Sequence, residues 1–166
     1  MKLLLYCTKA KPYLYQHFKG DFFTSRTYDK SCIYNGKIVA ECDFEVEALE
    51  RIGNNIRFAG VEDGEWLNNR YYEYKSCLSE EELFNYVKNK FYAIHIKNLN
   101  IFNKPKELSD YCLYPKNIKG VIHFVLEGTP YILLSVSPQE MFRLFNGEQT
   151  VLVRKKVLKE MFLNDK

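Results

Sequence analysis

Apolar and polar residues alternate over long stretches of this chain, and each alternating stretch predicts a half-buried β-strand. The clearest alternation runs over residues 37–47, just after Asn35-Gly36, a pair that predicts a tight turn because both residues tolerate a positive φ. A second alternating stretch covers residues 91–102. On the first of these strands we expect one apolar face, with Ile38, Ala40, Cys42, Phe44 and Val46, and one acidic face, with Glu41, Asp43, Glu45 and Glu47.

Short apolar runs predict further strands, at residues 2–8, 120–127, 131–136 and 150–153. Gly128-Thr129-Pro130 separates two of these runs and predicts a three-residue hairpin loop. Two other stretches give weaker signals. Residues 20–35 are ambiguous, with room for one irregular strand, and residues 53–74 show no sustained period, so we interpret the latter as a long loop or an insertion.

The helix signals are short but specific. Ser79 and Glu82 have the spacing of a capping box, which predicts a helix that ends near residue 89. Its inward side chains are expected to be Leu83, Tyr86 and Val87. Ser137-Pro138 and Asn146-Gly147 predict the start and the end of a second helix. Apolar spacing predicts a third helix over residues 155–163, and helical turns over residues 13–18 and 105–110.

Together these elements predict a single α+β domain over residues 1–166. Its architecture is expected to be a small β-barrel or a strongly curved mixed sheet, with three or so short helices. A chain of 166 residues is long enough to bury a core of its own. We expect residues 53–75 to form a variable insertion in this domain.

The amino-acid composition limits the kinds of ligand and site that can be expected. The formal net charge is only +3, so any nucleic-acid contact must depend on a local basic patch. The five cysteines form no Cys-x-x-Cys pair, and their odd number and scattered spacing predict reduced thiols. No ligands have metal-binding spacing, so neither a metal nor another cofactor is expected. No apolar run suits a signal peptide or a membrane span, so we expect a cytoplasmic protein without a membrane partner.

The end of the chain concentrates the candidate chemistry. A short helix over residues 138–145 leads into the strand at 150–153, which ends at Arg154-Lys155-Lys156. Three consecutive cations beside the end of a helix indicate a cleft for an anionic ligand. Such a run is also typical of the solvated start of a final helix.

This segment resembles the signature of ASCH domains, members of the PUA-like superfamily, which reads Gly-x-Lys-Thr-x-Glu-x-Arg after a strand and a helix. Here residues 147–154 read Gly-Glu-Gln-Thr-Val-Leu-Val-Arg. Residues 1–13, 35–47 and 92–111 are similar to a group of ASCH-bearing proteins common in Firmicutes and their prophages. The resemblance implies a PUA-like barrel whose cleft binds nucleic acid or a nucleotide.

Two positions depart from that signature. Gln149 stands where the signature has lysine, and Leu152 stands where it has glutamate or, in some members, threonine. Family members that hydrolyse small acylated nucleosides use those two positions. A glutamine cannot accept a proton as an amine does, and a leucine offers no heteroatom. The resemblance therefore implies binding without catalytic residues, with Thr150 and Arg154 retained.

The first hypothesis is a module that binds RNA, another single-stranded nucleic acid or a nucleotide. In it cations hold phosphate, an aromatic ring stacks on a base, and Gln149 contacts the base edge. Gln149 equally suits a cap on the turn at Gly147, and Thr150 suits an ordinary strand position. The residues expected to line the cleft are Lys9, Lys11, Gln149, Thr150, Arg154 and Lys155.

Two alternatives stay open. One is a residual amidohydrolase acting on modified nucleosides, in which Lys9 or Lys155 replaces the missing lysine. The other is a phage-encoded protein that binds and blocks a host factor such as a defence nuclease, with the acidic face of residues 41–47 imitating nucleic acid. His95 lies on the polar face of its strand, where we expect a surface histidine rather than a general base.

Overall fold

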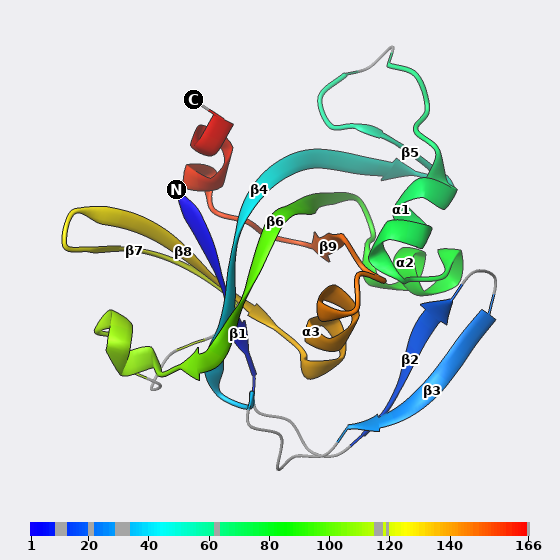
Figure 1. Ribbon diagram of the computed structural model, residues 1–166. Coiled ribbons are helices and arrows are strands. Elements are labelled where there is room, and N and C mark those ends of the chain that lie inside the picture. Colours follow the sequence, from blue (N-terminus) through cyan, green and yellow to red (C-terminus); the bar gives the residue numbers. More distant parts are fainter. Residues whose placement is uncertain are drawn as a thin grey trace.

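The computed structural model describes residues 1–8, 13–19, 22–28, 34–61, 64–114, 118 and 120–165, with the backbone alone for 13–19, 22–28 and 163–165 (Figure 1). One mixed sheet of seven strands has the order β7-β8-β1-β4-β6-β9, with β5 paired to β4. Its strands are β1 (Lys2–Cys7), β4 (Lys37–Ile52), β5 (Asn55–Phe58), β6 (Lys90–Lys106), β7 (Val121–Leu126), β8 (Thr129–Val136) and β9 (Val151–Arg154). A separate antiparallel hairpin consists of β2 (Tyr13–Lys19) and β3 (Phe22–Tyr28).

The sheet is strongly curved because its two longest strands bend together. β4 and β6 pair antiparallel over most of their length and arch across the molecule (Figure 1). Their register shifts near the start of β4, and such irregularities increase bend and twist. β7 and β9, the two ends of the strand order, do not pair, so the sheet is not closed into a barrel. Of the two architectures expected from the sequence, the curved mixed sheet is the one observed.

Short helices surround this sheet. The α-helices are α1 (Asn69–Ser76), α2 (Glu80–Tyr86) and α3 (Pro138–Phe145), and two 3₁₀-helices are η1 (Leu108–Tyr111) and η3 (Lys159–Asp165). α2 begins with the predicted capping box at Ser79, and α3 begins at the predicted Ser137-Pro138, where a second capping box is present. The last segment, predicted as an α-helix, is a 3₁₀-helix instead. Within the described ranges, no helix is both long and apolar enough to cross a membrane.

Alternation along β1 divides the core between the two faces of the sheet. Leu3 and Leu5 belong to the larger cluster, which α3 and η3 cover with Met141 and Met161. Leu4 points the other way, into a smaller cluster that η1 closes. A third cluster fills the space between α1, α2 and the strands β4, β5, β6 and β9. β1 therefore lies at the centre of the domain, with apolar contacts on both faces.

The hairpin between β7 and β8 is tighter than predicted. Glu127 and Gly128 alone form the turn, with φ values of 49° and 80°. Positive φ at both central residues is the geometry whose twist matches that of the flanking strands. Thr129 and Pro130, which we expected in the loop, are the first residues of β8.

Two stretches fold differently from expectation. Residues 13–18, predicted as a helical turn, lie in β2, because a short aromatic-rich run suits a strand as well as a helix. Residues 53–74, predicted as a loop, contain β5 and most of α1. The only buried residues of α1 are Tyr72 and Ser76, so the sequence shows no sustained helical period there.

The acidic face of β4 is present as predicted, and neighbouring side chains match its carboxylates. Lys2 donates to Asp43 at 2.7 Å, and this hydrogen bond lowers the pKa of Asp43. Tyr72 donates to Glu47 at 3.2 Å. Lysines pair with two of the carboxylates, Lys2 with Asp43 and Lys97 with Glu45, and His95 contacts Glu47. The two lysines therefore balance part of the charge of this face.

Three of the described thiols are buried, as expected from their apolar surroundings in the sequence. Cys7, Cys42 and Cys77 are buried thiols outside any disulfide, Cys112 is an exposed thiol, and Cys32 lies outside the described residues. Burial raises the pKa of Cys42 to about 12.

Replacing Ile94 by alanine should lower the free energy of unfolding by about 2–5 kcal/mol, because this side chain is fully buried in the larger cluster. Ile101→Ala on the same strand is the matched control. Ile101 is 39 % exposed, so its loss should cost less than about 1 kcal/mol. Urea unfolding followed by circular dichroism measures both values. Equal losses would contradict the assignment of Ile94 to the core.

Iodoacetamide at mildly alkaline pH should modify Cys112 and leave Cys42 intact, because a buried thiol with so high a pKa has almost no reactive thiolate. Peptide mapping by mass spectrometry distinguishes the two sites. Protein unfolded in urea is the control and should be modified at both. Equal rates at both sites in the folded protein would show that Cys42 is not buried.

Candidate functional site

A cleft of about 780 Å³ opens between α2 and α3, beside the ends of β8 and β9. Its volume lies within the range of small-molecule binding sites. The segments that form it are far apart in sequence and are brought together by the curvature of the sheet (Figure 1). We call it the α2–α3 cleft, and the lining residues used below are Tyr86, Ser135, Glu140, Arg143, Gln149 and Arg154.

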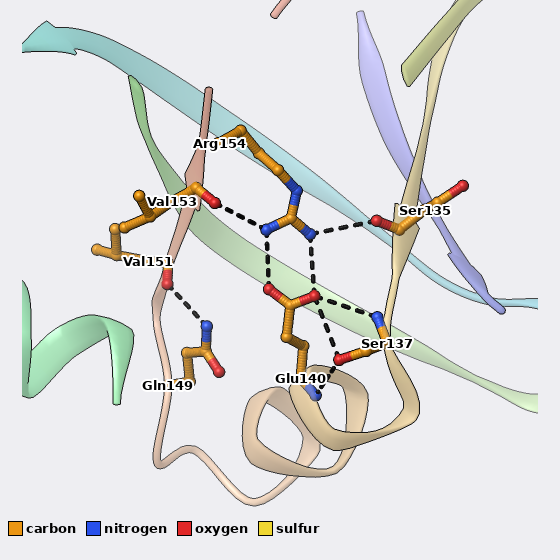
Figure 2. Close-up of polar contacts among 7 residues, drawn as sticks. All are labelled: Ser135, Ser137, Glu140, Gln149, Val151, Val153 and Arg154. Atoms are coloured by element: carbon orange, nitrogen blue, oxygen red, sulfur yellow. Dashed lines mark hydrogen bonds and ion pairs between the residues drawn. The ribbon is translucent and has the colours of Figure 1, made fainter. Parts of the chain in front are cut away.

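The start of α3 fixes Glu140 within this cleft. Ser137 Oγ accepts a hydrogen bond from the Glu140 N–H at 3.1 Å, and Glu140 Oε1 accepts one from the Ser137 N–H at 3.1 Å. This reciprocal capping box satisfies two backbone donors that the first turn of a helix otherwise leaves free. Pro138 at the start of the helix already has a suitable φ. The carboxylate is thereby held facing β9 (Figure 2).

Arg154 connects β8, α3 and β9 through one guanidinium (Figure 2). Its Nη1 donates to Glu140 Oε2 at 2.8 Å and to the Val153 carbonyl at 2.9 Å. Its Nη2 donates to Glu140 Oε1 at 3.0 Å and to the Ser135 carbonyl at 3.2 Å. The N–H groups of both terminal nitrogens are thus matched by acceptors from the chain itself.

This ion pair is half-buried and bidentate. The side chains of Arg154 and Glu140 are 19 % and 21 % exposed. Burial alone would lower the pKa of Arg154, but the adjacent Glu140 carboxylate outweighs it and raises that pKa. Because the two charges cancel and the guanidinium is bonded internally, a phosphate group would have to compete with Glu140 for Arg154. The role of Arg154 in the structure is therefore to hold the cleft together.

Gln149 supplies a buried amide to the cleft. Its side chain is only 3 % exposed, and its Nε2 donates to the Val151 carbonyl at 2.9 Å. Its Oε1 is buried and has no hydrogen-bond partner among the described residues. Figure 2 shows this amide lying between β9 and α3. A buried amide oxygen without a partner is costly, so a ligand donor that reached this atom would gain a favourable hydrogen bond.

Ser135 contributes its backbone to the cleft. Its carbonyl faces Arg154, whereas its hydroxyl points to the opposite side of β8 (Figure 2). The hydroxyl oxygen is also buried without a hydrogen-bond partner in the described part of the chain. Because it points away from the Arg154–Glu140 pair, we do not count it among the ligand-binding groups of the cleft.

An aromatic ring and a lysine lie at one side of the cleft. Tyr86, at the last turn of α2, is 37 % exposed although the sequence predicted an inward side chain. The Nζ of Lys155 lies 4.7 Å from the centre of the Tyr86 ring, a cation–π contact. Lys155 itself is exposed. This pair offers a flat surface and a positive charge next to the buried amide.

The structure brings three of the predicted site residues together and separates one. Gln149 and Arg154 line the cleft, and Lys155 reaches it through Tyr86. Thr150 is exposed and does not line the cleft; its backbone instead joins Lys75 and Ile96. Two further predicted residues, Lys9 and Lys11, lie outside the described residues.

The predicted site residues did not include the lining residues Tyr86, Ser135, Glu140 and Arg143. For Glu140 a signal existed, because its spacing from Ser137 is that of a capping box. No sequence signal identified Arg143, because a basic residue is common in the last turn of a helix. In the structure Arg143 is nevertheless only 5 % exposed.

The second departure from the signature has a structural explanation. Leu152 points to the side of β9 opposite Val151 and Val153, and it is fully buried in the larger cluster with Ile94. A polar residue in this place would lie in an apolar core. Leucine therefore serves the core here and adds no chemistry to the cleft.

Within the described ranges, no group of three or more histidine, cysteine, aspartate or glutamate side chains is arranged to hold a metal ion. Comparison of the chain with protein-family models, with curated proteins and with solved structures finds no match. The function must therefore be argued from the cleft itself.

The importance of the ion pair can be measured with Arg154→Met and Glu140→Gln, made singly and together. We expect a coupling free energy of roughly 1–3 kcal/mol in the stability to urea, because each single change leaves a half-buried charge unmatched. The exposed pair Lys97–Glu45, with side chains 53 % and 48 % exposed, is the matched control and should couple by less than about 1 kcal/mol. Equal coupling in the two pairs would contradict the structural role given to Arg154.

Proposed function

We propose that the α2–α3 cleft binds one nucleotide unit, either free or as an unpaired nucleotide of RNA or another single strand. In this proposal the chain is an ASCH-like domain of the PUA-like superfamily that binds its ligand without the usual catalytic lysine. The observation that carries the proposal is the buried amide of Gln149, whose oxygen has no partner.

The amide favours a ligand with a hydrogen-bonding edge. Because Nε2 of Gln149 is already bonded to Val151, the Oε1 atom is the free acceptor, and it suits an amino or ring N–H donor. Nucleobases carry such donors on a flat ring. Tyr86 provides an exposed aromatic surface close by, and stacking on such a surface is worth about 1–3 kcal/mol per base.

The charges of the cleft favour one nucleotide over a duplex. Arg154 is matched by Glu140, so the exposed lysines Lys155 and Lys156 are the cations best placed to meet a phosphate group. Duplex binding normally depends on many phosphate contacts. A volume of about 780 Å³ also suits a single unit of ligand.

The arrangement of the chain supports the family assignment. Residues 147–154, which resemble the ASCH signature, connect α3 to β9 and contribute Gln149 and Arg154 to the cleft. The sheet that carries them is mixed and strongly curved, although it is not closed into the barrel that the resemblance implies.

The alternatives have less support. Leu152 lies in the core and Gln149 is bonded to the backbone, so neither position supplies a base for hydrolysis. The acidic face of β4, which would imitate nucleic acid in an inhibitor, is matched by Lys2, Lys97 and His95 of the same sheet.

Fluorescence anisotropy with a labelled single-stranded RNA tests the proposal, with single-stranded DNA and duplex RNA for comparison. We expect single strands to bind more tightly than the duplex, and free nucleotides to compete. Gln149→Met should weaken binding by roughly tenfold, because it removes the buried acceptor while nearly keeping the side-chain size. Lys155→Ala should reduce the salt dependence, which is about 0.7 per phosphate contact for single strands.

Thr150→Val is the matched control, since Thr150 neighbours Gln149 but does not line the cleft. It should bind as the wild type does. If no nucleic acid or nucleotide binds, or if Gln149→Met binds as tightly as the wild type, the cleft is not a nucleotide site.

A further inference from the structure

β7 forms one edge of the sheet, and among the described residues only β8 pairs with it. The hairpin of β7 and β8 extends away from α1, α2 and α3 (Figure 1). Its strand β7 reads Val-Ile-His-Phe-Val-Leu, six residues without a formal charge at neutral pH when the histidine is neutral. A free edge of this kind is a template for pairing with another strand.

The hydrogen-bond pattern identifies the backbone groups that point outward. The Ser135 N–H donates to the Gly120 carbonyl at 2.8 Å, so residues 120 and 135 are a hydrogen-bonded pair. In an antiparallel ladder such pairs alternate with pairs that direct their N–H and C=O groups away from each other. By this alternation Val121, His123 and Val125 present both groups to the outside. In this assignment Val125 exchanges no backbone hydrogen bond with the residue opposite it. That residue is Pro130, which has no N–H to donate.

Two other free edges of the described sheet, on β6 and β5, carry protections that β7 lacks. The second half of β6 has lysines, Pro105, and Asn98 with a φ of 52°. The outer edge of β5 is met by Leu67, whose N–H donates to the Ile56 carbonyl at 2.7 Å. Charges, proline, irregular backbone and a covering loop are the usual means of preventing edge pairing. β7 has no lysine, no proline and a regular register with β8.

We propose that β7 pairs antiparallel with β7 of a second copy of this chain, around a two-fold axis at His123. The outward residues are symmetric about His123, so Val121 of one copy meets Val125 of the other, and each such pair exchanges two backbone hydrogen bonds. The contact joins the two seven-stranded sheets into one. It is isologous, and therefore stops at two copies.

The second copy is favoured as the occupant because β7 is complementary to itself. Valine faces valine on either side of the axis, and the neutral histidines face one another, so no like charges oppose. Val125 is 59 % exposed, and pairing would place it beside another apolar side chain. A strand with charges at these positions would lack this match.

Sedimentation velocity from micromolar to several hundred micromolar protein tests the proposal. The wild type should shift from the mass of one chain, 19.7 kDa, to twice that mass. His123→Glu places two carboxylates opposite each other at the axis and should weaken the dimer by at least roughly tenfold. His123→Thr, a neutral strand former at the same position, is the matched control and should keep the dimer.

A second variant and a second measurement keep the test decisive if His123→Glu folds poorly. Val125→Pro removes an outward N–H and leaves the ladder with β8 intact, so it too should weaken the dimer by at least roughly tenfold. Amide hydrogen exchange should be slow at Val121, His123 and Val125 in the wild-type dimer and fast in the monomeric variant.

Three results would overturn the proposal. One is a wild type that stays monomeric at every concentration. Another is a dimer that persists unchanged when His123→Glu and Val125→Pro are folded, because the dimer would then use a face other than β7. The third is slow exchange at the three outward amides of a monomer, because another part of the same chain would then cover the edge.

Discussion

The ion pair between Arg154 and Glu140 is the interaction on which the candidate site depends. β8 and β9 do not pair with each other in the curved sheet, and a carbonyl on each, at Ser135 and Val153, receives a hydrogen bond from the same guanidinium. An arginine can do this because its planar fork carries several donors in fixed directions. Glu140, held by the cap of α3, neutralises the charge and fixes the helix to both strands. One side chain thereby connects two strands that are not paired with each other.

Local signals in the sequence predicted much of the fold because they depend on neighbouring residues alone. The capping box at Ser79, the helix start at Ser137-Pro138 and the alternation of β4 are of this kind, and all three are present in the structure. β2 and α1 could not be predicted in the same way. β2 is a strand because β3 lies beside it, and α1 is a helix with only Tyr72 and Ser76 buried. In both cases tertiary contacts, rather than the local pattern, decide the conformation.

The candidate site was predictable in part for a similar reason. Gln149 and Arg154 were found through a motif, and both line the cleft. The partners of these residues could not be predicted, because they come from other segments of the chain. Glu140 contacts Arg154 only because the sheet curves, and no sequence spacing relates the two positions. The exposed position of Tyr86 was missed because the helical period only approximates the direction of a side chain at the end of a short helix. Leu152, a departure within the motif, is a core residue.

The open sheet also relates the cleft to the β7 edge. A closed barrel would pair its first and last strands and would leave neither an edge nor a gap. In this structure β9 forms one end of the strand order, where Arg154 connects it to β8. β7 forms the other end, and its outer edge has no partner strand among the described residues. β7 contributes no side chain to the α2–α3 cleft, so pairing along β7 would leave the lining residues in place. Two copies joined in this way would carry two clefts on one continuous sheet. If the cleft binds nucleotides as proposed, a single strand of RNA long enough to reach both clefts would bind more tightly than a free nucleotide.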